Sequence, residues 1–229
     1  MALPKLNETP KYSLTVPSTG QELRYRPYLV KEEKILLMAS SSEDPKQIMN
    51  AVHDTIAACV EDIDVRNLTT FDLEYIFIQL RSKSTGETSE ILIKCPKCES
   101  QQKVTIPLNE IEVTETTANP VIKISDTVTV VMKYPSYQDV PQTGEAEDVG
   151  FSLIASSIKE VISGDEKIDV QDEPIEGVIG FLESMTQDQF KLITKFFEDS
   201  PVVKYDLELI CQKCTTASNI EIKGLQSFF

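Results

Sequence analysis

Two stretches of the chain, ILIKCPKCESQQKVTI at residues 91–106 and LELICQKCTTASNIEI at residues 207–222, follow the same pattern. In each stretch, apolar and polar residues alternate into a Cys-x-x-Cys motif, and the alternation resumes after a short polar segment. Alternation of this kind is typical of a half-buried β-strand. The sequence therefore predicts two strand–turn–strand units, each with a Cys-x-x-Cys motif at its turn.

The two motifs supply four cysteines, which form a candidate metal site. Structural zinc sites are closed tetrahedra of four ligands, and thiolates are among the preferred ligands. Two residues between the cysteines of a motif allow both sulfurs to reach one ion from a tight turn. The sequence therefore predicts a structural Zn²⁺ whose ligands are Cys95, Cys98, Cys211 and Cys214.

The separation of the two motifs is unusual for such a site. Cys98 and Cys211 are 113 positions apart, whereas the two pairs of a compact zinc ribbon are separated by roughly 15–20 residues. The entropy cost of closing a loop grows only slowly with its length, so a large insertion is compatible with a single site. We call each Cys-x-x-Cys turn a knuckle. The predicted site is a zinc-ribbon-like pair of knuckles that is split by a long insertion.

Other uses of these cysteines fit the sequence less well. A thioredoxin-like redox pair lies where a strand meets a helix, whereas both motifs here lie between strands. Structural disulfides are rare in cytosolic proteins. A zinc deaminase needs a His-x-Glu motif and a proline before its Cys-x-x-Cys motif, but His53 lacks that glutamate and Lys94 precedes Cys95. Cys59 lies on an apolar helix face and is expected to be a buried hydrophobic residue.

The remaining patterns predict an α+β fold. Alternation predicts a hairpin at residues 12–25 and strands at residues 121–124 and 128–132, while apolar residues spaced by three and four positions predict helices. Asp44 followed by proline is a typical helix start, and Thr186 with Gln189 is a capping box. The predicted helices cover residues 30–39, 45–60, 70–82, 151–162, 175–185 and 186–200, with an acidic loop at residues 165–173.

We expect the chain to divide into three parts. The N-terminal hairpin covers residues 1–28. A helical part combines residues 29–82 with residues 148–200. A small antiparallel β part with the knuckles combines residues 83–134 with residues 201–229, and residues 135–147 form a linker.

The charge of the chain restricts its partners. It has 22 basic and 37 acidic residues, a net charge of −15, and −11 of that charge falls in residues 139–188. A negative protein repels nucleic acids and anionic membranes unless its cations cluster, and these do not. No apolar run reaches the roughly 20 residues of a membrane span, and the N-terminus lacks the apolar core of a signal peptide. We expect neither nucleic-acid nor membrane binding, and the acidic stretch is either a solvated face or a surface for a basic partner.

No arrangement of residues indicates an active site. The single histidine, His53, lies off the apolar stripe of its predicted helix, and neither glycine-rich phosphate-binding motif occurs. Four thiolate ligands would leave a zinc ion no open position for a substrate. The sequence predicts no catalytic residue and no enzymatic activity.

Two groups of side chains are candidate contacts with a partner protein. Tyrosine and arginine are enriched at interface hot spots, although a hairpin edge packed on the core would look the same. An apolar C-terminus either packs on the protein's own core or inserts into a partner. The candidate residues are Tyr25, Arg26, Tyr28, Leu225, Phe228 and Phe229.

Several longer motifs carry a resemblance to a known family. They are Pro17-Ser18-Thr19-Gly20, Tyr25-Arg26-Pro27-Tyr28, Val30-Lys31-Glu32-Glu33-Lys34, Thr70-Phe71-Asp72-Leu73-Glu74-Tyr75, Leu80-Arg81-Ser82-Lys83-Ser84-Thr85-Gly86-Glu87 and Gly224-Leu225-Gln226-Ser227-Phe228-Phe229. In this order they resemble the T4-type bacteriophage baseplate hub proteins over nearly the whole chain. The resemblance implies a non-enzymatic protein of tail morphogenesis, either a subunit of the central hub or a factor that assembles it.

The resemblance also implies partners and a location. The partners would be other baseplate hub proteins, with the tail spike and the tape-measure protein as candidates, in the virion baseplate or in the host cytoplasm during assembly. The zinc prediction rests on the cysteine spacing alone. An alternative function is a zinc-ribbon accessory protein of phage transcription or replication, which would need a basic and aromatic surface near the knuckles. The cations available there are Lys94, Lys97, Lys103 and Lys213.

Overall fold

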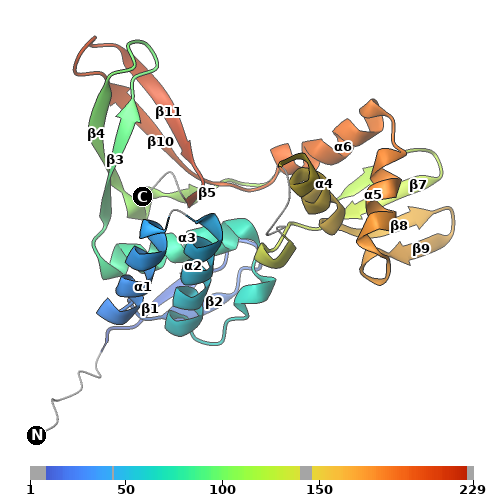
Figure 1. Cartoon of the computed structure of the whole chain (residues 1–229), viewed down its shortest axis with the longest axis horizontal. Coiled ribbons are helices and arrows are strands. Elements are labelled where there is room, and N and C mark those ends of the chain that lie inside the picture. Colours follow the sequence, from blue (N-terminus) through green and yellow to red (C-terminus); the bar gives the residue numbers. More distant parts are fainter. Residues whose placement is uncertain (1–8, 43, 140–145, 226–229) are drawn as a thin grey trace, which may run out of the picture. The chain divides into compact units, whose positions relative to one another are not determined.

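A computed structural model describes residues 9–42, 44–139 and 146–225 of the chain (Figure 1). The fold is α+β, with small antiparallel sheets, as predicted. The chain forms two compact units. Unit 1 comprises Met1–Val65, Phe71–Thr114 and Val202–Phe229, and unit 2 comprises Arg66–Thr70 and Glu115–Pro201.

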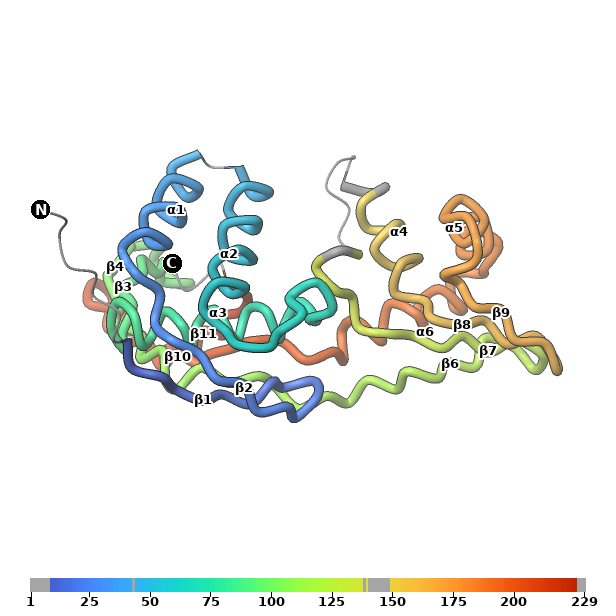
Figure 2. Tube along the Cα trace, turned by 90° about the horizontal axis from the view of Figure 1, so that it is seen from below, coloured from blue at the N-terminus to red at the C-terminus, as the bar shows by residue number. Residues whose placement is uncertain are grey.

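Unit 1 contains a hairpin, three helices and two further small sheets. Its elements in chain order are β1 (Tyr12–Thr15), β2 (Glu22–Tyr25), α1 (Val30–Ser41), α2 (Pro45–Cys59), α3 (Thr70–Ser84), β3 (Thr88–Lys94), β4 (Gln101–Pro107), β5 (Glu112–Val113), β10 (Val203–Ile210) and β11 (Ala217–Lys223). A short 3₁₀ turn lies at Leu108–Glu110, and another, Val65–Asn67, begins at the last residue before the Arg66–Thr70 segment of unit 2. Figure 2 shows α1 and α2 side by side.

The centre of unit 1 is α3. Leu73, Ile76, Ile78 and Leu80 of this helix are buried, although they point in different directions around its axis. No residue of α3 is exposed, as expected of a helix that lies inside a core. The hairpin β1–β2 contributes buried Leu14 to the same unit.

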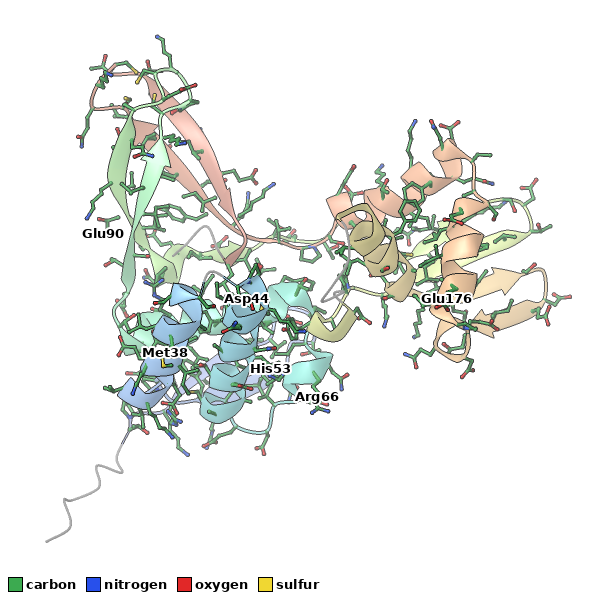
Figure 3. The ribbon with its side chains drawn as sticks, viewed as in Figure 1. Met38, Asp44, His53, Arg66, Glu90 and Glu176 are labelled. Carbon is green, nitrogen blue, oxygen red and sulfur yellow. The ribbon has the colours of Figure 1, made fainter. Side chains whose placement is uncertain are left out.

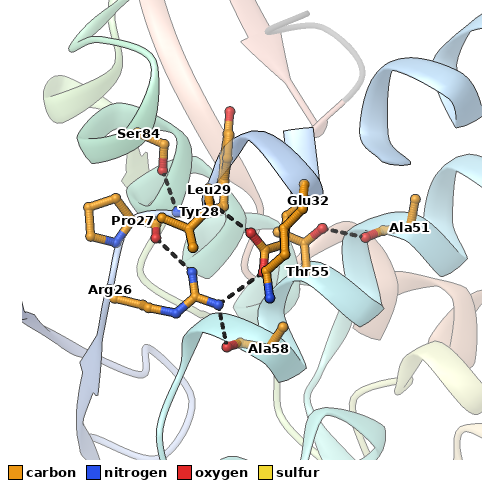
Figure 4. A network of polar contacts seen from close by, with 10 residues as sticks. Arg26, Pro27, Tyr28, Leu29, Glu32, Ala51, Thr55, Ala58 and Ser84 are labelled. Carbon is orange, nitrogen blue, oxygen red and sulfur yellow. Dashed lines mark hydrogen bonds and ion pairs between the residues drawn. The ribbon is translucent and has the colours of Figure 1, made fainter. Parts of the chain in front are cut away.

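Polar contacts fix the N-terminal hairpin and α1 in unit 1. The backbone N–H of Ser18 donates to the buried Asp72 carboxylate of α3 at 2.9 Å, and the Ser18 hydroxyl donates to it as well. Arg26 donates to Glu32 of α1 and to the carbonyl oxygen of Ala58, both at 3.0 Å (Figure 4). Asp72 and Arg26 thus each bond to a segment that is distant in the sequence.

Two predicted helix starts are confirmed. The Asp44 carboxylate accepts the backbone N–H of Lys46 at 2.9 Å, and Pro45 opens α2. Thr186 and Gln189 form the predicted capping box, because each backbone N–H donates to the other residue's side chain, at 2.9 Å and 3.3 Å.

Unit 2 is a four-stranded antiparallel sheet covered by helices. Its elements are β6 (Val121–Lys123), β7 (Val128–Met132), α4 (Ala146–Ser156), β8 (Ile158–Ser163), β9 (Glu166–Asp169), α5 (Ile175–Glu183) and α6 (Gln187–Glu198), with 3₁₀ turns at Tyr137–Asp139 and Val170–Asp172. The strand order is β6-β7-β8-β9. All three helices and the sheet contribute to the core, which contains Val130, Met132, Ala155, Ile158, Val178, Leu182, Ile193 and Phe196.

One predicted helix is wrong, and this error changes the division of the chain. The helix expected at residues 151–162 ends at Ser156, and residues 158–163 form strand β8, which pairs with β7 and β9. The hydroxyl of Ser157 bonds to the carbonyl oxygen of Leu153 at 2.8 Å where the helix stops. The β-branched residues after it favour a strand and complete a sheet there.

The units therefore differ from the parts expected from the sequence. Residues 148–200 were expected to join residues 29–82, but they share unit 2 with β6 and β7 because β8 belongs to their sheet. The expected acidic loop at residues 165–173 contains β9 and a 3₁₀ turn. Of the expected linker at residues 135–147, residues 140–145 lie outside the described residues.

No helix in the described parts of the chain combines the length and apolar character needed to cross a bilayer.

Candidate metal centre

The four predicted ligands come together where the two hairpins end. β3 pairs with β4 and β10 pairs with β11, so each Cys-x-x-Cys motif lies at a hairpin turn, as predicted. The Sγ atoms of Cys95 and Cys214 are 3.7 Å apart, and those of Cys98 and Cys211 are 3.6 Å apart. All four sulfurs lie within 4.8 Å of one another.

These distances fit a tetrahedral metal site. With a Zn–S distance of about 2.3 Å, the sulfurs of a regular tetrahedron are about 3.8 Å apart. Each of these two sulfur pairs joins one hairpin to the other, so one ion would be held by both turns. In the described part of the chain, this is the one group of three or more His, Cys, Asp or Glu side chains whose ligand atoms converge.

The first knuckle has a tight backbone turn. The carbonyl oxygen of Cys95 accepts the N–H of Glu99 at 2.9 Å, and the N–H of Cys95 donates to the carbonyl oxygen of Ser100 at 2.9 Å. Glu99 has a φ of 56°, in the left-handed region. The backbone is thereby folded so that both sulfurs of the motif lie on the same side of the turn.

The second knuckle repeats this turn. The N–H of Thr215 donates to the carbonyl oxygen of Cys211 at 2.9 Å, and the N–H of Cys211 donates to Thr216 at 3.0 Å. Thr215 has a φ of 55°. Non-glycine residues rarely adopt this conformation, so its occurrence at equivalent positions shows that both hairpins impose the same local geometry.

Two hydroxyl groups contact the sulfurs. The Ser100 Oγ atom lies 3.1 Å from the Cys98 sulfur and 3.4 Å from the Cys211 sulfur, and the Thr216 Oγ1 atom lies 3.4 Å from the Cys214 sulfur. Ser100 and Thr216 occupy the same position in their knuckles. The Ser100 hydroxyl is the main cause that lowers the pKa of Cys211 to about 5, and the Thr216 hydroxyl is the main cause that lowers the pKa of Cys214. Both shifts favour the thiolate, which is the form that binds a metal.

The thiol of Cys95 behaves differently. The backbone N–H groups of Cys98 and Lys97 favour its thiolate, but burial and the neighbouring sulfurs of Cys211 and Cys214 outweigh them, and the pKa of Cys95 is raised. Closely spaced thiols cannot all ionise without a cation between them. A divalent ion at the centre of the cluster would remove this conflict.

Gln102 is a residue of this site that sequence analysis missed. Its Nε2 group donates to the carbonyl oxygen of Ile210 at 3.3 Å, and its Oε1 atom accepts the backbone N–H of Gln212 at 3.1 Å. One side chain of the first hairpin thus bonds to the backbone on both sides of Cys211. No signal in the sequence distinguishes Gln102 from Gln101.

The six candidate contact residues occupy different environments. Tyr25 and Tyr28 are buried, which favours the packing alternative over partner contact. Leu225 is also buried, and its backbone N–H bonds to Glu74, whose pKa is raised by burial. Arg26 bonds within unit 1, as described above. Phe228 and Phe229 lie outside the described residues, and their contact with a partner stays a prediction.

The single histidine, His53, and the fifth cysteine, Cys59, lie in α2. His53 has its Nδ1 atom 3.8 Å from the Asp54 carboxylate (Figure 3). Cys59 is buried, as predicted, and burial raises the pKa of its thiol to about 11. This thiol stays protonated at neutral pH and acts as a small hydrophobic group.

A family model described as T4 bacteriophage base plate protein matches residues 9–229. The chain belongs to this family. The match spans both units and both knuckles of this base plate protein, and it confirms the resemblance seen in the sequence motifs. Membership places the chain in the phage base plate, among other base plate proteins. No curated protein and no solved structure matches it.

Proposed function

We propose that this base plate protein is a non-enzymatic component of the central hub, either a structural subunit or a chaperone-like assembly factor, that acts by protein–protein contacts. The observation that carries the proposal is the cysteine cluster, in which sulfurs 113 residues apart in the chain lie 3.6 Å from each other. Four of the five cysteines of the chain therefore lie where two hairpins that are distant in the sequence meet. In this proposal the fold presents contact surfaces to other base plate proteins, as membership of this family suggests.

The proposed metal is a structural Zn²⁺ held by the four cysteines. The four thiolates supply a complete tetrahedral ligand set, so such an ion has no open position for a substrate. It would bond the β3–β4 hairpin to the β10–β11 hairpin. Because a structural ion binds the folded chain only, its binding energy contributes to folding.

The proposed contact surface for a basic partner is in unit 2. This unit has 17 acidic and seven basic residues, a net charge of −10. An exposed run of carboxylates extends from β9 to the start of α5, where Figure 3 labels Glu176; its members are Glu166, Asp169, Asp172, Glu173 and Glu176. A charged surface of one sign speeds the encounter with a partner of the opposite sign, and the effect weakens as salt is added.

The alternative of a nucleic-acid accessory protein has less support. Near the knuckles, Lys103 pairs with Glu90 at 3.2 Å, and Glu99 lies within the first turn. These carboxylates reduce the positive charge that a phosphate backbone would need. The matching family is one of base plate proteins.

Copy counting tests the hub proposal. Quantitative mass spectrometry would compare this chain in purified virions, in isolated hubs and in infected-cell lysate. A small fixed number of copies in isolated hubs identifies a structural subunit, and co-purification with hub intermediates but not with virions identifies an assembly factor. Recovery with the outer parts of the base plate, and none with hubs or hub intermediates, would contradict the proposal.

A further inference from the structure

The four sulfurs of the cysteine cluster form two pairs, each of which joins one hairpin to the other. The sulfurs of Cys95 and Cys214 are 3.7 Å apart, and those of Cys98 and Cys211 are 3.6 Å apart. A disulfide bond is about 2.05 Å long, so each sulfur would have to move by less than about 1 Å to form one. The two pairs share no sulfur, so both bonds can form in the same molecule.

Each pair combines a partly exposed cysteine with a buried one. Cys98 and Cys214 are partly exposed, whereas Cys95 and Cys211 are buried. A dissolved oxidant therefore reaches Cys98 and Cys214 first. An oxidised cysteine forms a disulfide when an unoxidised thiolate lies next to it. Cys211 lies in that position for Cys98, and Cys95 does so for Cys214.

Further contacts keep the two knuckles together while the metal ligands are lost. Gln102 of the first hairpin bonds to the backbone on both sides of Cys211. The Ser100 hydroxyl lies 3.1 Å from the sulfur of Cys98 and 3.4 Å from that of Cys211. These contacts hold the sulfurs of opposite hairpins against each other, which favours bonds between the hairpins over bonds within a Cys-x-x-Cys motif.

We propose that the cysteine cluster is a redox-sensitive site, in which a peroxide converts the four metal-binding thiolates into the disulfides Cys95–Cys214 and Cys98–Cys211. The proposal rests on the proposed zinc site but not on a position in the hub. Disulfides persist at virion surfaces, whereas the cytosol keeps thiols reduced. A phage protein is made inside a host cell, and membership of the family places this chain in the base plate. The same cysteines therefore meet both environments.

The reaction balances with two molecules of hydrogen peroxide per chain. The thiolate of Cys98 attacks a peroxide oxygen, the O–O bond breaks, and a sulfenic acid and hydroxide form. The thiolate of Cys211 then attacks the Cys98 sulfur, forms the S–S bond and expels a second hydroxide. Cys214 and Cys95 react in the same way with the second peroxide. Four thiolates thus lose four electrons to two O–O bonds, and the metal ion is released because no thiolate ligand remains.

Oxidation would replace a metal link between the hairpins with a covalent one. Cys98 and Cys211 are 113 positions apart, and a disulfide that closes a long loop restricts the unfolded chain strongly. We therefore expect the Tm of the oxidised chain to stay the same when a chelator is added. The Tm of the reduced, zinc-loaded chain should fall under the same treatment.

Peptide mapping of the zinc-loaded, full-length chain after treatment with hydrogen peroxide tests the proposal. Lysines separate all four cysteines, so trypsin leaves each on its own peptide, namely residues 95–97, 98–103, 205–213 and 214–223. We expect residues 95–97 linked to 214–223, and residues 98–103 linked to 205–213. One zinc ion per chain should be released during the reaction, as measured with a colorimetric chelator. Cys59, which is buried outside the cluster, should remain a free thiol.

Two matched pairs of chains serve as controls. Cys59→Ala should give the same peptide map and the same zinc release as the wild-type chain. Gln102→Ala should lose part of the links between hairpins in favour of links within the motifs, whereas Gln101→Ala should keep the wild-type map.

Several outcomes would overturn this proposal and leave the structural zinc in place. They are zinc retained through the treatment, sulfinic acids in place of disulfides, links within the Cys-x-x-Cys motifs of the wild-type chain, and a link between Cys95 and Cys211. Zinc content of the reduced chain is measured first, because a reduced chain without zinc would overturn the zinc site and this proposal with it.

Discussion

Glu99 and Thr215 have the same left-handed backbone conformation, each one residue after a Cys-x-x-Cys motif. A side chain in this region meets the following carbonyl oxygen, and the strain costs about 1–2 kcal/mol. Glycine avoids that strain but adds freedom to the unfolded chain. The knuckle geometry is therefore maintained by the hairpins and, in our proposal, by the metal, at a local cost in backbone energy.

Replacing one of these residues with glycine should stabilise the protein. We expect Glu99→Gly to raise the free energy of unfolding by about 0.5–1 kcal/mol, because the relief of strain exceeds the added entropy of the unfolded chain. The control is Glu208→Gly, at an exposed and extended position in β10, which should destabilise the protein. Denaturant unfolding measures both, and a loss of stability in Glu99→Gly would contradict the assigned turn.

Glu32 should make the stability of unit 1 depend on pH. Burial raises the pKa of this carboxyl group, but bonds from Arg26, from the N–H of Leu29 and from Lys31 outweigh burial, and its pKa lies below the usual 4.5. A lowered pKa means that its contribution is complete above about pH 4.5 and is lost as the pH falls through the folded-state pKa.

The variant Glu32→Gln tests this contribution. We expect it to lower the free energy of unfolding by about 2 kcal/mol at neutral pH, because charged hydrogen bonds become neutral ones. The difference from wild type should shrink below pH 4. Glu176→Gln, at an exposed position, is the control and should behave as wild type. Equal losses for Glu32→Gln at both pH values would show that the charge is not the cause.

At the level of the hairpins, Gln102 bonds the first hairpin to the second knuckle outside the cysteine cluster. We expect Gln102→Ala to reduce the free energy of unfolding by about 1–2 kcal/mol, since it leaves the carbonyl group of Ile210 and the N–H of Gln212 without this partner. Gln101→Ala changes the exposed neighbouring residue and should have little effect. Thermal melting compares the two, and equal shifts would remove the assigned role of Gln102.

The sequence predicted the elements with strong local signals and failed where two signals conflicted. The Asp44 start, the capping box at Thr186 and the two knuckle hairpins depend on residues close together in the chain, and all are confirmed. The segment from Ile158 to Ser163 carries apolar residues at spacings that fit either a helix or a strand. Its pairing with β7, which decides the matter, is a contact between distant segments.

In the candidate site, too, the sequence predicted only the residues that a local pattern indicates. The spacing of the cysteines predicted all four clustered residues, because a Cys-x-x-Cys motif restricts the sulfurs locally. The hydroxyl of Ser100 and the amide of Gln102 reach across to the other hairpin. Such contacts depend on how the hairpins meet, and serine and glutamine occur in too many other settings to signal it.

At the scale of the whole molecule, the chain has two compact units, and the cysteine cluster belongs to unit 1. Removing the proposed metal should therefore act mainly on that unit. We expect hydrogen exchange after chelation to speed up in β3, β4, β10 and β11, while the amides of β7, α5 and α6 keep their protection. Uniform acceleration over both units, or no change in the hairpins, would contradict a metal that joins the two hairpins of unit 1.

In our proposal, one structural zinc ion joins the two hairpins through four cysteines. The most direct test measures zinc content and thermal melting together for the wild-type chain, Cys95→Ser, Cys214→Ser and the control Cys59→Ala, whose cysteine lies outside the cluster. We predict one zinc per wild-type chain, loss of zinc with a lower Tm in both serine variants, and retained zinc in Cys59→Ala. A wild-type chain without zinc, or serine variants with full zinc content and an unchanged Tm, would contradict a structural zinc site at these cysteines.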